Sequence, residues 1–198
     1  MNLPDYHDPR SSFWQHAFKR AADYETYLHG SPHQHSDRWR AMAKQLPPLT
    51  AEQVGRLQGY HRTLHVLVLS GVWCGDCVRQ VPMIKQVTDA IGDAAHLRII
   101  DRDVDEKLRD ELRIVGAARV PIALFLTEDF WELLRFGDRS LTAYRAKSRR
   151  EVGPACSLGI IAPPPDELAA EQAEWVDQAE RALLMARLSP PLRQRHND

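Results

Sequence analysis

Apolar residues gather in four short runs between residues 64 and 137, and each run is expected to form a β-strand. The first run, Leu64 to Leu69, contains four consecutive apolar residues without alternation, which is typical of a strand covered on both faces. The other strands are expected at residues 97–100, 122–126 and 132–136. After each of the first two strands, apolar residues recur at helical spacing, up to Gly92 in the first case and Gly116 in the second. Val115 lies on the predicted buried face of the second helix. The order β–α–β–α–β–β predicts an α/β domain whose central mixed sheet is flanked by helices.

Helical patterns also occupy the sequence before the first strand. One helix is predicted from Ser11 or Ser12 to Gly30, and His33-Gln34-His35 falls in the break that follows it. A second helix is expected through Trp39 and Leu46, stopped by two prolines. A third begins at Thr50, which has the spacing of a capping box with a glutamine three residues later. Residues 1–59 are therefore expected to form a helical extension that packs on the domain.

The sequence after the last strand predicts further helix. Residues 140–150 are basic and favour a helix, and residues 151–165 are rich in proline and glycine and favour a loop. The last predicted element is a helix from Asp166 to Leu188, which Pro190-Pro191 ends. We expect the core of the domain at residues 60–140, and a loop and C-terminal helix at 141–198 that complete the same domain.

Composition and charge narrow the classes of partner. Of 198 residues, 43% are hydrophobic and 27% charged, as in globular proteins. The formal net charge of −1 gives no global attraction to nucleic acid or to an anionic membrane. No apolar run reaches the roughly 18–20 residues that span a bilayer, and the polar N-terminus does not resemble a secretory signal. We therefore expect a cytoplasmic protein with no nucleic-acid or membrane partner; its oligomeric state stays open.

The clearest chemistry lies at Cys74 and Cys77, which form a C-x-x-C motif between a buried strand and a helix. Cys74 is expected at the helix N-terminus, where unpaired N–H groups and the helix dipole stabilise a thiolate. A thiolate is the species that attacks a disulfide. Cys77 lies about one helical turn later and can release a substrate bound through Cys74. Gly75 is expected to permit the tight entry into the helix, whereas the charge of Asp76 opposes a second negative charge nearby.

A C-x-x-C motif can also be half of a structural zinc site. Such a site needs two more ligands, usually a second cysteine pair or a histidine pair. Cys156 is alone, and His33 and His35 belong to the N-terminal extension. We therefore predict no metal, and interpret Cys156 as an idle thiol rather than a partner in a mixed disulfide.

Four features in order resemble the thioredoxin family. Trp73-Cys74-Gly75-Asp76-Cys77 is similar to the W-C-G-P-C motif of thioredoxins, and Pro82 stands where thioredoxins have a proline that kinks the helix. Val120-Pro121 resembles the family's cis-proline site, and Gly137 resembles a glycine beside the active site. The resemblance covers roughly residues 60–140, and the extension with the Trp-Cys-Gly-Asp-Cys form is similar to a less-studied bacterial branch.

The resemblance implies a role for each residue. Cys74 would be the nucleophile and Cys77 the resolving thiol, Trp73 an apolar rim, and Pro121 a cis-proline packed against the disulfide. The backbone of Val120 would pair with an extended substrate segment. With Trp73, Val120 and Pro121, the expected substrate-binding residues include Gly75 and Asp76. No cofactor is expected beyond a redox-active Cys74–Cys77 disulfide.

The sequence departs from the family at one buried position. Thioredoxins carry an aspartate six residues before the first cysteine, which is thought to move the proton of the resolving thiol. Val68 stands there in this chain, so that function is missing or supplied by another group. Asp76 and the acidic residues Asp101, Asp103 and Asp105 are candidates, although a solvated loop and helix start also explain the last three.

Three functions remain open at this point. The first is a thiol–disulfide oxidoreductase that acts on protein disulfides and is served by an unidentified reductase. The second is a non-catalytic binding scaffold with a thioredoxin fold. Val68 and the helical additions at both ends of the chain favour this function. The third is a metal-binding protein.

Overall fold

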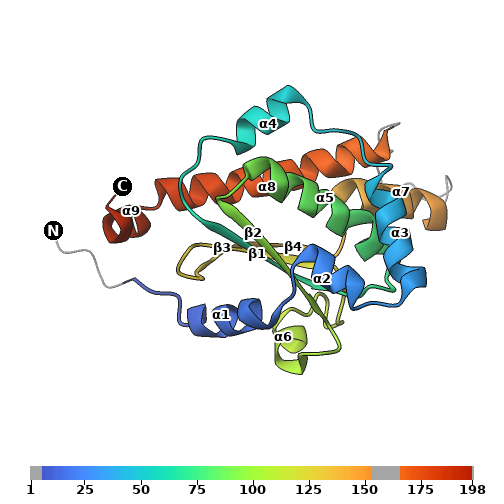
Figure 1. Cartoon of the computed structure of the whole chain (residues 1–198), viewed down its shortest axis with the longest axis horizontal. Helices are drawn as coiled ribbons and strands as arrows, with labels where there is room; N and C mark the ends of the chain where they lie inside the picture. The colour runs from blue at the N-terminus through green and yellow to red at the C-terminus, as the bar shows by residue number, and fades with distance from the viewer. Residues whose placement is uncertain (1–5, 153–165, 198) are drawn as a thin grey trace.

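The computed structural model describes residues 6–152 and 166–197 and contains one four-stranded sheet (Figure 1). Its strands are β1 (Leu64–Ser70), β2 (Ala95–Asp101), β3 (Ile122–Leu126) and β4 (Glu132–Gly137). The order across the sheet is β2-β1-β3-β4. β1 is parallel to β2 and antiparallel to β3, and β3 is antiparallel to β4. The predicted mixed sheet is therefore confirmed.

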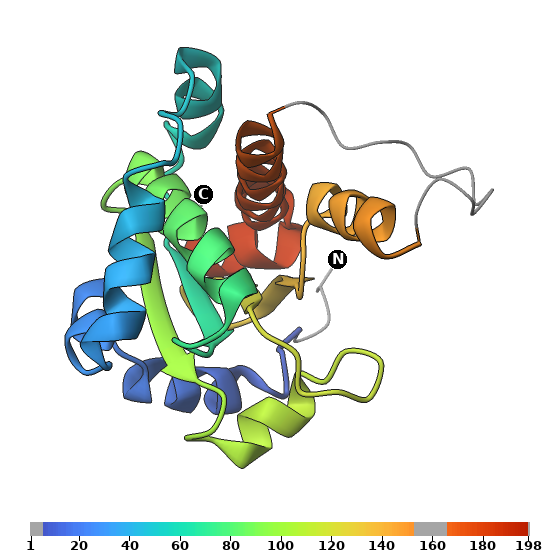
Figure 2. The same ribbon diagram turned by 90° about the vertical axis from the view of Figure 1, so that its right-hand side faces the viewer.

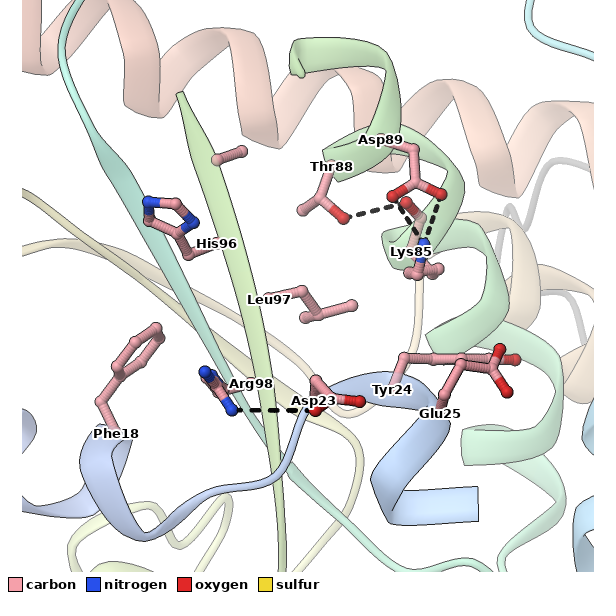
Figure 3. Close-up of a pocket in the computed structure, with 11 residues that line it drawn as sticks. Phe18, Asp23, Tyr24, Glu25, Lys85, Thr88, Asp89, His96, Leu97 and Arg98 are labelled. Carbon is pink, nitrogen blue, oxygen red and sulfur yellow. Dashed lines mark hydrogen bonds and ion pairs between the residues drawn. The ribbon is translucent and has the colours of Figure 1, made fainter. Parts of the chain in front are cut away.

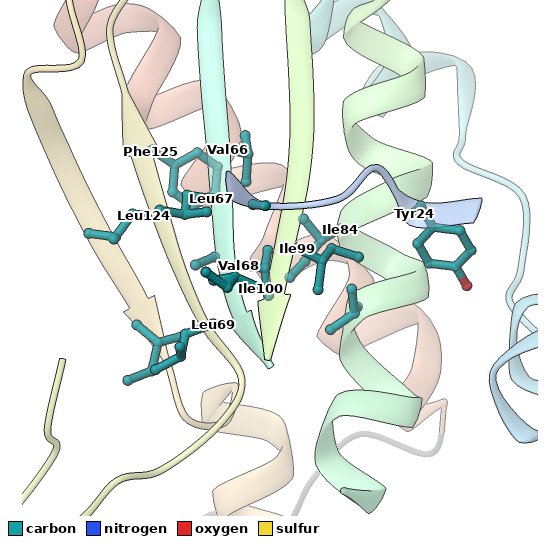
Figure 4. Close-up of a cluster of buried hydrophobic side chains, with 14 of the residues drawn as sticks. Tyr24, Val66, Leu67, Val68, Leu69, Ile84, Ile99, Ile100, Leu124 and Phe125 are labelled. Carbon is teal, nitrogen blue, oxygen red and sulfur yellow. The ribbon is translucent and has the colours of Figure 1, made fainter. Parts of the chain in front are cut away.

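Helices cover both faces of the sheet. Figure 2 shows α5 (Gly75–Ile91) and α8 (Glu167–Leu188) on one face, and α1 (Ser11–Arg20) and α6 (Glu106–Glu111) on the other. This arrangement explains why β1 has no alternation: Leu67 and Val68 point to opposite faces, and both are fully buried. Figure 4 shows this central strand between β3 and β2, with Ile84 of α5 beside Ile99 of β2.

The remaining helices lie around this core. They are α2 (Tyr24–His29), α3 (His33–Ala43), α4 (Ala51–Leu57), α7 (Leu141–Val152) and α9 (Pro190–His196). Thr50 caps α4 in the predicted capping box with Gln53. In the described part of the chain, no helix is both long and apolar enough to cross a bilayer.

The single helix predicted from residue 11 to residue 30 is wrong. The chain leaves the helix at Ala21 because Ala22 pairs with Ile99 on β2, with N···O distances of 2.9 and 2.7 Å. Asp23 then caps α2 by accepting a hydrogen bond from the Thr26 N–H. The break expected at His33 to His35 is also wrong, since these residues form the first turn of α3.

Two helix ends also differ from the prediction. α6 ends at Glu111 and not at Gly116, because Ile114 and Ala117 pair across a tight turn. Val115 and Gly116 at the tip have φ values of 51° and 73°, as in a type I′ turn, and Val115 is 89% exposed rather than buried.

Pro190-Pro191 ends α8 as expected but also begins α9, since proline is tolerated in a first helical turn. The loop predicted at 151–165 falls largely outside the described residues, and so does Cys156; residues 151 and 152 still belong to α7.

Candidate active site around Cys74

The loop between β1 and α5 places Cys74 at the start of a helix. The backbone N–H of Cys74 donates to the Gly71 carbonyl at 2.9 Å, which closes a tight turn. Cys74 is the N-cap residue of α5, and its carbonyl accepts the first helical hydrogen bond, from Val78. The side chain is half-buried, so the sulfur sits at the surface of the protein above the helix.

The surroundings of Cys74 stabilise its thiolate. A hydrogen bond from the Cys77 thiol is the largest cause that lowers the pKa of Cys74, to about 6, and the backbone N–H groups of Cys77 and Asp76 add to it. Partial burial and the Asp76 carboxylate act in the opposite direction and raise this pKa. At neutral pH Cys74 is therefore mostly the nucleophilic thiolate.

Cys77 has the opposite character. Its side chain is fully buried, and its sulfur accepts a hydrogen bond from the Gly71 N–H at 3.4 Å. Burial raises the pKa of the Cys77 thiol far above its usual value, and the adjoining Cys74 raises it further. One half-buried thiolate thus lies next to one fully buried thiol.

The segment before β3 meets Cys74 from the other side. The Val120–Pro121 peptide bond is cis, as expected, and the Cys74 sulfur lies 3.7 Å from the Val120 carbonyl oxygen, to which its protonated form donates. Gly137 of β4 packs on this segment so closely that a β-carbon there would lie 2.3 Å from the Pro121 carbonyl oxygen. Only glycine fits at position 137, which also has a φ of 151°.

Trp73 forms part of the surface beside the cysteines. Its side chain is 42% exposed, so it is not simply packed in the core. The Arg102 guanidinium lies over the indole ring, 4.5 Å from the ring centroid, and also donates to the Ala118 carbonyl at 2.8 Å. Arg102 therefore ties Trp73 to the loop that leads to Val120.

The two residues between the cysteines differ in their contacts. Asp76 forms a bidentate ion pair with Arg139. The Arg139 Nε lies 3.1 Å from one carboxylate oxygen, and its Nη2 contacts the other. A side chain on Gly75 would meet open space, so the expectation that glycine is needed there for a tight entry is wrong.

Sequence reasoning missed the charged group that surrounds Asp76. Arg139 and Arg119 both bind the Asp138 carboxylate, at 3.2 and 3.0 Å, and the Tyr144 hydroxyl donates to the same carboxylate. Neither the spacing nor the type of these residues marks them. Asp138, Arg139 and Tyr144 follow β4, whereas Arg119 precedes β3, and they come together because β4 ends beside Pro121.

Two further observations concern the residue at position 68 and the prediction of no metal site. Val68 is fully buried in β1 and brings no polar group to Cys77. In residues 6–152 and 166–197, no three metal-ligating side chains of the Cys, His, Asp or Glu type lie together.

A pocket of about 520 Å³ lies away from the cysteines, between α2, α5 and β2 (Figure 3). Four of its charged side chains form two ion pairs: Lys85 binds Asp89, and Arg98 lies 4.0 Å from Asp23. Neither Cys74 nor Cys77 lines this pocket, which is separate from the candidate active site.

The sheet order, the C-x-x-C motif at a helix start and the cis-proline opposite it define the class of thioredoxin-fold proteins. A family profile described as thioredoxin matches residues 21–148, well over half of the chain. The chain therefore belongs to the thioredoxin family. The match begins inside the N-terminal helices, so the family resemblance extends beyond the core of residues 60–140 on which the sequence motifs lie.

Solved structures agree with this fold. A protein of unknown function from Pseudomonas aeruginosa is similar with a TM-score of 0.57 and 23% identity, over 84% of this chain and 90% of that one. A designed HIV epitope-scaffold is similar with a TM-score of 0.58 and 20% identity, over 85% and 92% of the two chains. A search of curated proteins found no match.

Proposed function

We propose that this protein is a thiol–disulfide oxidoreductase that acts on protein disulfides through Cys74 and Cys77. The observation that carries the proposal is the opposite character of the two sulfurs. Cys74 is accessible and its pKa is lowered to about 6, whereas Cys77 is buried directly behind it with a raised pKa. Such a pair favours attack by one cysteine and resolution by the other.

The reaction balances without an added cofactor. The Cys74 thiolate attacks one sulfur of a substrate disulfide, forms a mixed disulfide and releases the other substrate sulfur as a thiolate. Cys77 then loses its proton and attacks the Cys74 sulfur. The Cys74–Cys77 disulfide forms as the bond to the substrate breaks, so the substrate gains two electrons that the cysteine pair has lost. An unidentified reductase would return the pair to the dithiol.

The surface around Cys74 suits an extended protein segment. Trp73 offers an apolar face, and the Val120 backbone and Pro121 line the other side of the sulfur. Substrate recognition through Trp73, Asp76, Val120 and Pro121 is part of the proposal, and a reducing cytoplasm is the compartment in which such a pair would cycle.

Reduction of insulin disulfides with dithiothreitol as electron donor tests the activity. We expect Cys74→Ser to abolish turnover, and Cys77→Ser to stop after one covalent mixed disulfide per chain, visible by mass spectrometry. Cys156→Ser is the matched control and should retain full activity. Unchanged turnover in Cys74→Ser would rule the proposal out.

The reduction potential of the pair decides the direction of the reaction. A value near −270 mV would make the protein a reductant, and one of about −120 to −180 mV an oxidant or isomerase. If no Cys74–Cys77 disulfide forms at any potential, a binding scaffold becomes the better explanation of the fold.

A further inference from the structure

The proposed reaction requires a group that accepts the proton of the Cys77 thiol. In the dithiol, Cys77 donates its proton in a hydrogen bond to the Cys74 sulfur. Once Cys74 is bonded to a substrate, its sulfur carries no negative charge to receive that proton. Cys77 is fully buried, so water cannot take the proton directly. Another protein group must accept it before Cys77 can attack.

Three polar residues lie on the buried side of Cys77. Ser70 ends β1 and is fully buried, and it pairs in register with Asp101 at the end of β2. Tyr27 of α2 reaches over the same strand ends and donates its hydroxyl to the Asp101 carboxylate at 3.3 Å. Asp101 is only half-buried, so this series of groups begins at Cys77 and ends at solvent.

Ser70 connects the cysteine to the tyrosine. Its hydroxyl lies near both groups and lowers the pKa of Cys77 and of Tyr27. Even so, among the described residues its oxygen has no partner in full hydrogen-bond geometry. A buried hydroxyl without a partner costs about 1–3 kcal/mol. It can recover this energy when it donates to a thiolate that forms on Cys77.

The other acidic candidates are occupied elsewhere. Asp76 is held by Arg139 on the side of Cys74. Asp105 caps α6 and binds Arg20, and Asp103 is exposed. Burial raises the pKa of Tyr27 well above its usual value, and Asp101 raises it further, so Tyr27 stays protonated and serves as a donor rather than as the final base.

We propose that Ser70 and Tyr27 relay the proton of Cys77 to the carboxylate of Asp101 when the mixed disulfide is resolved. The proposal rests on the function proposed above and adds residues to it. As the Cys77 proton passes to the Ser70 oxygen, the Ser70 proton passes to Tyr27 and the Tyr27 proton to Asp101. Asp101 becomes a neutral acid and later loses the proton to water. The Cys77 thiolate then attacks Cys74 and expels the substrate thiolate. In this relay Ser70 takes the proton from the reacting sulfur, and Tyr27 and Asp101 act through Ser70.

A coloured disulfide separates the two steps in one experiment. Reduced protein is mixed in a stopped-flow instrument with the symmetrical disulfide of nitrothiobenzoate. Attack by Cys74 releases one coloured thiolate, and resolution by Cys77 releases the second. We expect Tyr27→Phe and Asp101→Asn each to slow the second release by about tenfold to a hundredfold, at the lower end of what a positioned proton-transfer group contributes. The first release should change less than about twofold, because Cys74 is already a thiolate.

The matched control is Tyr24→Phe, on the same helix. Tyr24 is buried, and among the described residues its hydroxyl has no hydrogen-bond partner, so both releases should keep the wild-type rates. The double variant of Tyr27→Phe and Asp101→Asn should resolve no more slowly than the slower single variant, because the two residues act in one relay. A purely structural role would not confine the defect to the second release.

The outcomes separate the two proposals. If the wild-type protein releases only one coloured thiolate, as Cys77→Ser must, the proposed function fails and the relay fails with it. If the wild-type protein releases two and both Tyr27→Phe and Asp101→Asn do so at wild-type rates, the relay alone is wrong. If Tyr27→Phe unfolds, which thermal unfolding detects, the rates of Asp101→Asn and Ser70→Ala decide.

Discussion

At the scale of single residues, one ion pair affects the pKa of Cys74. The Asp76 carboxylate raises the pKa of Cys74, while Arg139 binds that carboxylate and offsets its charge. The two effects come from side chains that are 63 residues apart in the sequence. An acidic residue between the cysteines is therefore compatible with a low pKa at Cys74 as long as its partner is in place.

Removal of the Arg139 charge and removal of the Asp76 charge should move the pKa of Cys74 in opposite directions. We expect Arg139→Gln to raise it, because the Asp76 charge is then unopposed, and Asp76→Asn to lower it. The wild-type alkylation rate should fall as the pH drops through about 6, since the thiolate is lost there.

The pH dependence of iodoacetamide alkylation of Cys74 measures these shifts. Cys77→Ser can serve as the background for all variants if its own midpoint is recorded first. Equal midpoints in Arg139→Gln and Asp76→Asn would contradict the role assigned to the ion pair.

At the scale of elements, the N-terminal helices hold the cysteine loop in place. The Trp39 indole N–H of α3 donates to the Val72 carbonyl at 2.9 Å, two residues before Cys74. Trp39 is fully buried, and Tyr27 of α2 packs against its ring. The extension therefore supplies a hydrogen bond to the backbone of the candidate active site, which distinguishes it from a mere covering of the sheet.

Trp39→Phe should leave the buried Val72 carbonyl without its donor. An unsatisfied buried acceptor costs about 1–3 kcal/mol, in addition to the cavity that the smaller ring leaves. Trp175→Phe is the matched control, because Trp175 is equally buried and, in the described part of the chain, its N–H has no acceptor.

Denaturant unfolding should show Trp39→Phe to be less stable than Trp175→Phe by about 1–3 kcal/mol, the share due to the lost hydrogen bond. Equal losses would mean that the bond to Val72 contributes nothing beyond packing.

At the scale of the whole molecule, segments from both ends of the chain complete one core. Trp14 and Trp39 before β1, and Trp175 after β4, belong to the same cluster of buried residues as the strands. Ala22 also forms a bridge to β2, so the extension takes part in the hydrogen bonding of the sheet edge. The division into residues 1–59, 60–140 and 141–198 stays a prediction. In the structure, residues from all three segments pack into one hydrophobic core.

A chain that lacks residues 1–59 should therefore not fold cooperatively. It would expose the apolar face of β2 and α5 that α1, α2 and α3 cover, and the loss of Trp14, Trp39 and Leu28 alone removes about 1.5–3 kcal/mol of burial per side chain. Circular dichroism and a thermal unfolding transition measure the outcome. A sharp transition in the truncated chain would show that residues 60–198 form a complete core.

Local pattern was enough for most of the fold. The apolar run at β1, the glycine after α5 and the capping box at α4 each predicted their element, because strand burial, helix termination and capping depend on neighbours in the sequence. The prediction was wrong at Ala22 and Val115. A backbone pairing with a distant strand decides the first, and a tight turn with positive φ at a valine decides the second; neither leaves a signal in hydrophobic periodicity.

The sequence by itself determined the order of the strands along the chain, the mixed character of the sheet, and the position of Cys74 at a helix start with Cys77 one turn later. These follow from spacing over one strand, one turn and one helix, where chain geometry leaves few choices. Only the tertiary structure decided which side chains gather around the cysteines: Arg139 on Asp76, and Tyr27 on Asp101, which pairs in register with Ser70. These contacts join segments far apart in the chain, and a charge or hydroxyl affects a sulfur through distance in space, which no local pattern records.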